Sequence, residues 1–343
     1  MANSVTLRDV AEMAGVSMGT ASQALNNRPN VAPETRARVV DAAKTLGYIS
    51  KSPITEPREN HLKIIGLITK HDLGEPLTVN PFYSYIQAGI ESECRERDIS
   101  LMYATVEVDQ SNHPVIWPTM IKEQHVEGLI LAGTFIEETV DLFQRRIDVP
   151  IVLVDSYAPN LPFDSVVIDN TPAATMAVEY LIKHGHKRIG LIGWNEKAPP
   201  SIQERKMGYM QALQKHSLCD TFIQPSTVVD REDGRKALLG LLERFPDITA
   251  LFACNDLVAL GAMSAARELG LKVPDDLSVI GFDNIAPAKE IIPPLTTVHV
   301  HKTWLGMISV RQLIERVMIP EQPKVTITVS TQLVVRESVG PHP

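Results

Sequence analysis

Polar and aromatic side chains follow several of the short apolar runs in this 343-residue chain. They are Phe82, Tyr83, Asp155, Trp194, Arg205, Asn255 and Asp283. Arginine donates hydrogen bonds, aspartate accepts them and asparagine does both, whereas aromatic rings stack on apolar faces. If the apolar runs are strands, these side chains lie near carboxyl ends, where open α/β sheets bind ligands. The pattern predicts a binding site for a small polar molecule.

Two of these positions have a second interpretation. Asn255 directly precedes an expected helix and also suits its amino-terminal cap, as does its neighbour Asp256. Phe82 begins an apolar helical stripe with Ile86 and Ile90, so it suits a buried core as well as a pocket. Both interpretations stay open at the level of sequence.

No residue pattern predicts catalysis, so we expect no catalytic residues, no metal and no cofactor. The segment GLIGW at 190–194 is not a dinucleotide-binding GxGxxG, and there is no phosphate-binding P-loop. His184 and His186 lie at an expected helix end, where imidazole suits the helix dipole better than it suits a metal site. Scattered cysteines indicate reduced thiols and a cytoplasmic protein: Cys94, Cys219 and Cys254.

A second pattern lies near the start of the chain, where residues 5–25 predict two short helices joined by a tight turn. Thr6 suits the start of the first helix, Gly15 ends it and Ser17 caps the second. This layout is typical of a helix-turn-helix, which places its second helix in the major groove of DNA. A plain helical hairpin would show much of the same pattern.

A third helix is expected from Pro33 to Leu46, so residues 1–49 would form a small all-α head. Residues 50–62 are polar and contain Pro53 and Pro57. Because Pro57 lacks the N–H that a helix needs at this point, we expect an extended or kinked linker.

The remainder of the chain alternates short apolar runs with amphipathic stretches. The runs lie at 64–68, 99–104, 128–132, 150–154, 188–192, 250–254 and 278–282. Runs that are apolar on both faces are typical of strands buried in a parallel sheet, and alternation with helices predicts a doubly wound α/β fold. About seven or eight strands in roughly 230 residues favour two sheets in two lobes over a single sheet.

The charge is distributed unevenly between these parts. The whole chain has a net charge of −8, yet its first fifty residues carry five basic and four acidic side chains. An acidic body with a slightly basic head fits a protein that touches DNA only through the head. No apolar run approaches the ~20 residues that a membrane helix needs, and no secretory signal begins the chain.

Residues 5–48 resemble the DNA-binding head of the lactose/galactose repressor family (LacI/GalR type). Downstream matches are NPFY at 80–83, HGHKRIGLIG at 184–193, VPDDLSVIGFDN at 273–284 and PPLTTV at 293–298. The resemblance covers nearly the whole chain in the same order. It implies a repressor that works as a homodimer on near-palindromic double-stranded operator DNA. It also implies a periplasmic-binding-protein-like core with a small effector, a sugar or sugar derivative, between two lobes.

The resemblance further implies domain boundaries. Residues 63–343 would form the effector-binding and dimerisation domain, with 50–62 as the hinge. The amino-terminal lobe would comprise about 63–168 and 299–325, and the carboxyl-terminal lobe about 169–297 and 326–340.

The second helix of the head carries the residues that match the base readers of the family, Met18, Gly19 and Gln23. Gln23 suits a bidentate contact with adenine, whereas many relatives carry arginine there, which suits guanine. We therefore predict an operator altered at that base pair. The matches to phosphate-contacting positions are Thr6, Ser17, Thr20, Asn26 and Tyr48.

In the core, Arg205, Asn255 and Asp283 match positions that hydrogen-bond sugar hydroxyls in the family. Trp194 or Tyr83 would stack on the apolar face of a sugar ring. The hinge departs from the family, because Pro57 stands where a leucine wedges into the minor groove. The hypothesis is that this linker stays flexible on DNA.

Two other functions remain as alternatives. One is a cytoplasmic sugar-sensing solute-binding protein, whose DNA binding is weakened by the proline in the hinge. The other is an enzyme with an α/β core, because acidic residues in a cleft also suit catalysis. The attached head and the lack of a catalytic motif favour the repressor over both.

Overall fold

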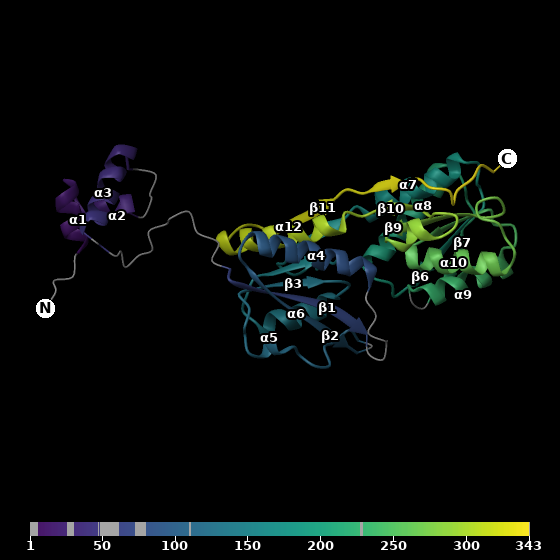
Figure 1. Cartoon of the computed structure of the whole chain (residues 1–343), viewed down its shortest axis with the longest axis horizontal. Coiled ribbons are helices and arrows are strands. Elements are labelled where there is room, and N and C mark those ends of the chain that lie inside the picture. The colour runs from purple at the N-terminus through teal and green to yellow at the C-terminus, as the bar shows by residue number, and fades with distance from the viewer. Residues whose placement is uncertain are drawn as a thin grey trace. The chain divides into compact units, whose positions relative to one another are not determined.

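The computed structural model describes residues 6–25, 31–46, 48, 62–72, 80–109, 111–226 and 229–342. The chain separates into two compact units, Met1–His61 and Leu62–Pro343 (Figure 1). Of the predicted hinge only Leu62 is described, so Pro57 lies outside the described residues, as does Asn26. No helix in the described ranges is both long and apolar enough to cross a membrane.

The first unit contains three helices within its described residues, namely α1 (Leu7–Ala14), α2 (Met18–Leu25) and α3 (Pro33–Leu46). Their small apolar side chains form one core. The buried members of this core are Val10, Ala11, Ala14, Ala21, Ala24, Leu25, Val31, Val39, Ala42 and Ala43. This is the predicted all-α head, and its third helix has the predicted bounds.

Local contacts determine where α1 begins and ends and where α2 begins. The carboxylate of Asp9 accepts hydrogen bonds from the backbone N–H of Thr6 at 2.8 Å and from its hydroxyl at 2.7 Å. These hydrogen bonds lower the pKa of Asp9, with a further contribution from the nearby positive charge of Arg8. Gly15 has a φ of 66°, the left-handed conformation that ends α1. Ser17 then accepts a hydrogen bond from the backbone N–H of Thr20 at 3.0 Å, which caps α2.

The second unit contains two six-stranded sheets. We call each sheet, together with the helices that pack on it, a lobe: the first lobe contains the first sheet and the second lobe the second sheet. The first sheet has the order β11-β5-β4-β3-β1-β2, and its described pairs are all parallel. Its strands are β1 (Ile64–Asp72), β2 (Ser100–Val108), β3 (Gly128–Ala132), β4 (Ile151–Val154), β5 (Asp164–Ile168) and β11 (Thr326–Val329). One face packs against α4 (Pro81–Glu96) and α12 (Lys302–Met318), and the other against α5 (Thr119–Lys122) and α6 (Glu137–Arg146).

The second sheet has the order β12-β10-β9-β8-β6-β7, with only its edge pair β12–β10 antiparallel among the described pairs. Its strands are β6 (Ile189–Trp194), β7 (Phe222–Pro225), β8 (Ala250–Ala253), β9 (Ser278–Asp283), β10 (Thr296–His299) and β12 (Gln332–Val334). One face packs against α7 (Asn170–Lys183) and α8 (Pro200–Lys215), and the other against α9 (Arg231–Arg244) and α10 (Asp256–Glu268). A short helix, α11 (Pro287–Glu290), follows β9.

The chain passes between the lobes after β5, after β10 and between β11 and β12 (Figure 1). The two-lobed α/β architecture is therefore as predicted. The prediction that places residues 326–340 in the second lobe is wrong for β11, because Thr326–Val329 pairs with β5 in the first sheet. The two short strands on either side of this crossing have similar compositions, so the sequence does not show where the chain changes lobe.

Candidate functional site

The described part of α2 exposes the side that was predicted to read bases. Ala21 and Leu25 are buried against the head core, whereas Gly19 and Gln23 lie one turn apart on the exposed side. Met18, at the start of the helix, is 54% exposed. The helix therefore packs through one face and leaves a surface of small and uncharged residues available for a groove.

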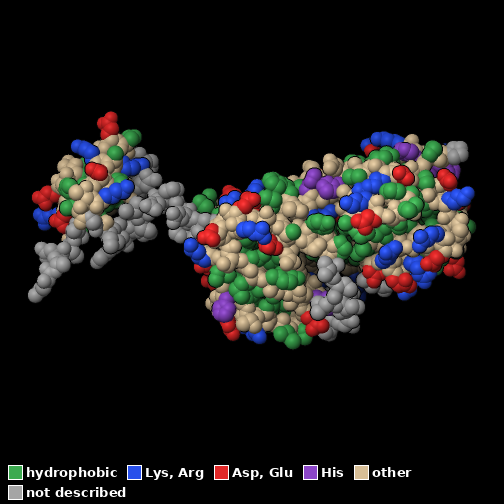
Figure 2. Space-filling view, viewed as in Figure 1, with side chains coloured by type: hydrophobic (Ala, Val, Ile, Leu, Met, Phe, Trp, Pro, Cys, Tyr) green, Lys and Arg blue, Asp and Glu red, His purple; other side chains and the backbone are tan. Residues whose placement is uncertain are grey.

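The predicted phosphate-contacting residues lie around this helix. Thr6 and Ser17 are exposed at the starts of α1 and α2, and the Ser17 hydroxyl lies 2.8 Å from that of half-buried Thr20. Tyr48 is half-buried against the head core, and its backbone N–H donates to the carbonyl of Ala43 at 2.9 Å. The described surface of the head carries both basic and acidic side chains (Figure 2). Its attraction for phosphate thus depends on where individual groups stand.

In the second unit, residues from both lobes form a compact cluster of four, which we call the effector cluster: Tyr83, Asp155, Arg205 and Asp283. Tyr83, on α4, donates its hydroxyl proton to Oδ2 of Asp155, which follows β4, at 2.9 Å. Arg205, on α8, lies with Nη1 3.2 Å from Oδ1 of Asp283, the last residue of β9. The two aspartates lie at the carboxyl ends of strands from different sheets, and Arg205 is near enough to lower the pKa of both.

Arg205 is held rigidly within the cluster. It is 3% exposed, and its Nη1 donates to the carbonyl oxygen of Cys254 at 2.7 Å. Its Nε donates to Oδ1 of Asn170 at 3.0 Å, and its guanidinium lies 3.8 Å from the centre of the Phe282 ring. A buried charge fixed on three sides in this way presents its remaining donors in a defined direction.

The two aspartates of the cluster are shifted towards the neutral form. Burial raises the pKa of Asp155 to about 6, although Arg205 and the hydrogen bond from Tyr83 oppose the shift. Burial also raises the pKa of Asp283 against the opposing charges of Arg205 and Lys302. In both cases burial is the largest cause of the shift, and buried carboxyl groups with shifted pKa values are typical of functional sites.

Asp283 and Asp155 also have unusual backbone conformations, with φ of 106° and 57°. Positive φ is uncommon for residues other than glycine, and such strain concentrates at functional sites. Asp283 is 7% exposed, and its Oδ1 forms an ion pair with Nη1 of Arg205 at 3.2 Å. Lys302, the first residue of α12, is 5% exposed and donates to the backbone carbonyls of Asp283 and Asn284. Lys302 therefore holds the backbone at Asp283, while the carboxylate of Asp283 faces Arg205.

The structure does not bring every predicted residue into this cluster. The side chain of Asn255 caps α10, since its Oδ1 accepts from the N–H of Val258 at 2.8 Å and its Nδ2 donates to the carbonyl of Val229 at 3.0 Å. These contacts support the capping interpretation of Asn255. Asp256 is fully buried and binds the N–H of Ile285 and the hydroxyl of Thr297. Burial raises the pKa of Asp256 to about 8.

The aromatic residues differ in their surroundings. Phe82 is buried in the core and packs edge-on against Tyr83, with ring centroids 5.2 Å apart. Trp194 donates its indole N–H to Oε1 of Gln203 at 2.7 Å, and Nζ of Lys206 lies 3.4 Å from the centre of its ring. Lys206 thus covers one face of the Trp194 ring, and the side chain is half-buried against the core.

Three polar residues at the cluster were not predicted: Tyr157, Asn170 and Glu204. Asn170 contacts both Arg205 and Glu204, and Tyr157 contacts Glu204. Glu204 directly precedes the predicted residue Arg205, and Asn170 lies just after the expected boundary between the lobes at 168–169, with only Asp169 between. That adjacency was the available signal, but it does not show which side chains meet in space.

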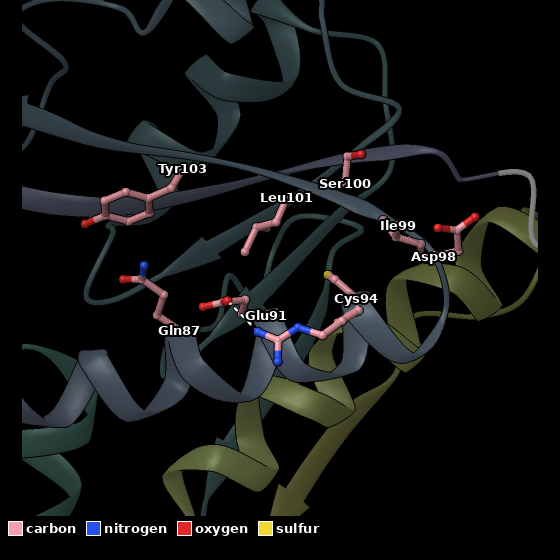
Figure 3. A pocket seen from close by; sticks show the side chains of 9 residues that line it. Gln87, Glu91, Cys94, Asp98, Ile99, Ser100, Leu101 and Tyr103 are labelled. Atoms are coloured by element: carbon pink, nitrogen blue, oxygen red, sulfur yellow. Dashed lines mark hydrogen bonds and ion pairs between the residues drawn. The ribbon is translucent and has the colours of Figure 1, made fainter.

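A shallow hollow of about 490 Å³ lies elsewhere, on the first lobe between α4 and the start of β2 (Figure 3). Glu91 and Arg95, which line it, form an ion pair of 2.8 Å with each other. None of the predicted effector residues lines this hollow. No group of three or more histidine, cysteine, aspartate or glutamate residues in the described ranges could hold a metal ion.

Comparison with known proteins agrees with this arrangement. Residues 6–51 match the model for bacterial regulatory proteins of the lacI family, and residues 178–339 match that for a periplasmic binding protein-like domain. The chain is 32% identical to the HTH-type transcriptional repressor PurR of Mannheimia succiniciproducens, over 97% of this chain and 98% of that protein. The chain belongs to the lacI family of bacterial regulatory proteins.

Solved structures of other regulators share the fold of this lacI-family chain. The transcriptional regulator CelR in complex with cellobiose has a TM-score of 0.70 and 28% identity, covering 97% of this chain and 99% of that one. The lac repressor dimer bound to operator and the anti-inducer ONPF has a TM-score of 0.69 and 26% identity, covering 98% and 99%. The lacI-family chain is a DNA-binding transcriptional repressor.

Proposed function

We propose that the effector is an uncharged sugar or sugar derivative bound between the two lobes by the effector cluster. The observation that carries this proposal is the convergence of Tyr83 and Asp155 from the first lobe with Arg205 and Asp283 from the second. A ligand that bridges these groups would stabilise one arrangement of the lobes over others. The effector would thereby change the affinity for DNA, and DNA would change the affinity for effector by the same factor.

The chemistry of the cluster favours hydroxyl groups over anionic groups. In the ionised state it contains two carboxylates, Asp155 and Asp283, and one guanidinium, that of Arg205. Carboxylates accept hydrogen bonds from paired hydroxyls, and arginine donates to ring and hydroxyl oxygens. A phosphate or carboxylate would face repulsion from both aspartates. The complex of CelR with cellobiose shows that a related protein binds an uncharged sugar.

Individual roles follow from these contacts. Asp283, which is ion-paired with Arg205, would accept from ligand hydroxyls, and Arg205 would donate to ligand oxygens. Tyr83 would orient Asp155, while Trp194 would cover an apolar face of the sugar. Phe82 would hold the ring of Tyr83 in place by packing against it from the core. Asn255 would affect the site indirectly, because its side chain caps α10 and so helps to position that helix.

For the DNA-binding part, we infer that the chain acts in the cytoplasm as a homodimer on a near-palindromic operator. The lac repressor of the related structure is a dimer bound to operator. Large apolar side chains of the core are exposed in the single chain, including Ile292 at 89% and Trp304 at 45%. Met18, Gly19 and Gln23 would read bases, and Gln23 would favour adenine.

A ligand screen tests the effector proposal. Thermal unfolding of the full chain would be measured with cellobiose, ribose and glucose 6-phosphate, because a ligand that binds the folded state raises the midpoint as its concentration increases. We expect a neutral sugar to raise the midpoint in the parent protein and to have no effect on an Asp283→Asn variant. A larger shift with the sugar phosphate would contradict the proposal.

The best ligand would then be added to operator-binding measurements. The operator would be selected in vitro from random duplexes by the full chain, so no prior target is needed. We expect the sugar to change operator affinity by about 5–150-fold, the usual range for coupled sites. Binding of the sugar without any change in operator affinity would exclude it as the effector.

A further inference from the structure

A hydrogen bond joins the two lobes beside the effector cluster without using any of its four residues. Tyr157, in the segment after β4, donates its hydroxyl proton to Oε1 of Glu204 on α8 at 2.7 Å. Nδ2 of Asn170 donates to the other carboxylate oxygen of Glu204 at 3.0 Å. Each oxygen of Glu204 therefore has a protein donor, one from the first lobe and one from the second.

Asn170 connects this carboxylate to the arginine of the cluster. Its Nδ2 faces Glu204, while its Oδ1 accepts from Nε of Arg205 at 3.0 Å. The amide group is planar and has one acceptor side and one donor side, so fixing one side fixes the other. Asn170 is only 4% exposed, which leaves little room for an alternative arrangement. Glu204 thus determines which atom of Asn170 is presented to Arg205.

The positions of these residues in the chain strengthen the connection. Tyr157 lies two residues after Asp155, and Glu204 directly precedes Arg205. The hydrogen bond between Tyr157 and Glu204 therefore holds the segment with Asp155 against the helix with Arg205. The hydroxyl of Thr171 also donates to the backbone carbonyl of Glu204 at 3.2 Å, which ties this turn of α8 to α7.

The hydroxyl of Tyr157 remains a donor over the physiological pH range. Burial and the adjacent carboxylate of Glu204 raise the pKa of Tyr157 to about 12. A hydrogen bond from a hydroxyl to a carboxylate is stronger than one between neutral groups. This contact therefore stabilises the arrangement of the lobes in which Tyr157 meets Glu204 over arrangements in which the two residues are apart.

We propose that Glu204 is a positioning residue for the effector site. Through Asn170 it orients Arg205, and through Tyr157 it holds the lobes at the separation where Asp155 and Arg205 face the same ligand. Both oxygens of Glu204 are already bonded to protein donors, so it acts without contacting the effector. This inference rests on the proposed effector site, since Arg205 and Asp155 are the groups it positions.

The test uses the full chain without ligand and two measurements. The first follows the Nε–Hε signal of Arg205 by nitrogen-15 NMR, assigned by its loss in Arg205→Lys. The second follows amide hydrogen exchange in residues 155–158 of the first lobe. In Glu204→Ala we expect the Arg205 signal to shift, because Asn170 loses the acceptor that fixes its amide. We also expect exchange in 155–158 to rise about tenfold, the effect of losing one hydrogen bond to a charged group.

Tyr157→Phe separates the two actions of Glu204. It should raise exchange in 155–158 as Glu204→Ala does, and it should leave the Arg205 signal near its parent position. The double variant should exchange no faster than either single variant, because both remove the same contact.

Matched controls remove similar groups that act within one lobe. Tyr209 donates to the carbonyl of Ile189 at 2.8 Å, and Glu179 forms an ion pair of 2.7 Å with Lys215. Tyr209→Phe and Glu179→Gln should leave both the Arg205 signal and the exchange of 155–158 unchanged. An unchanged Arg205 signal in Glu204→Ala, or equal effects from the controls, would overturn the inference.

Neither the NMR measurement nor the hydrogen-exchange measurement needs a ligand, so their outcomes are separate from the outcome of the sugar screen. If no sugar binds but the signals respond as expected, the effector proposal fails and the positioning contacts stand. If a sugar binds with the same affinity to parent and Glu204→Ala, the positioning role is wrong and the effector site stands.

Discussion

The head and the effector cluster hold their functional side chains in opposite ways. On α2, Gln23 and Met18 are exposed and belong to a helix whose opposite face packs on the head core. In the cluster, Arg205 and Asp283 are buried and make contacts with elements far away in the chain. A surface that must fit a groove can be built from one helix, whereas a site that must sense a small molecule needs groups from both lobes. The difference predicts which changes alter stability and which alter only recognition.

The largest expected effect is that of Arg205→Ala, which removes a buried charge next to two carboxylates. We expect it to lower the free energy of unfolding by about 3–5 kcal/mol, because the remaining charges lose their partner. Chemical denaturation of the full chain would measure the loss. Arg95→Ala is the matched control, since Arg95 forms an exposed pair with Glu91 and should cost less than about 1 kcal/mol. Equal losses would show that the cluster is not a charge network of this kind.

Gln23→Arg should change recognition without changing stability. We expect the preferred base pair under this residue to change from A·T to G·C, with about 1–3 kcal/mol of discrimination at that position. Selection from random duplexes, followed by binding measurements at one salt concentration, would detect the change. Gln144→Arg adds the same charge to an exposed position of α6 and should leave sequence preference as it is. An unaltered preference in Gln23→Arg would remove Gln23 from the base-reading residues.

The pH dependence of stability should have opposite signs in the two regions. The pKa of Asp155 is about 6 in the folded protein, above the ~3.9 expected after unfolding, so the folded state binds the proton more tightly. Asp155 therefore destabilises the core increasingly as the pH rises from about 4 to 6. Relative to Asp155→Asn, the parent should lose up to about 2 kcal/mol between pH 4 and pH 7. Thermal unfolding of both proteins across this range would measure the difference.

Asp9 in the head has a lowered pKa, mainly because of its hydrogen bonds with Thr6. Its contribution to stability is therefore present above pH 4 and is lost as the pH falls below that value. Amide exchange in α1 should increase on acidification in the parent and change less in Asp9→Asn. The same sign of pH dependence at both aspartates would contradict the contrast between the regions.

The smallest expected effect is the loss of a local cap in the head. Ser17→Ala removes the acceptor for the N–H of Thr20, which costs about 1 kcal/mol. Amide exchange in α2 should increase while exchange in α10 of the core stays the same. If both regions responded, the head and the core would not be separate units as the fold indicates.

The predictions from the sequence succeeded best where contacts are local. Gly15 and Ser17 were identified from spacing alone, and strands β1–β4, β6, β8 and β9 were found because their apolar runs are continuous. Strands β5, β7, β10, β11 and β12 were not predicted. Segments such as Thr326–Val329 and Gln332–Val334 have only three or four residues and half-exposed side chains. Their pairing is determined by neighbouring strands, which a local pattern does not contain.

The site residues divide in the same way. Tyr83, Asp155, Arg205 and Asp283 were predicted as separate positions at strand ends, and the structure places them together. That Asn255 acts as a cap was left open, because a cap and a ligand contact need the same residue at the same place. Whether an oxygen atom is available to a ligand depends on which protein donors already contact it. Those donors come from distant parts of the chain.

The helices of the head, the alternation of strands and helices, and the kinds of groups at the carboxyl ends of strands could all be predicted from local patterns. These features depend on interactions over a few residues and on the burial pattern of each element. The pairing of β11 with the first sheet and the contact of Glu204 with Tyr157 across the lobes follow from the folded chain alone. Contacts between residues distant in the chain depend on how two sheets pack and where the chain crosses between them. A local sequence pattern does not predict how the two sheets pack or where the chain crosses between them.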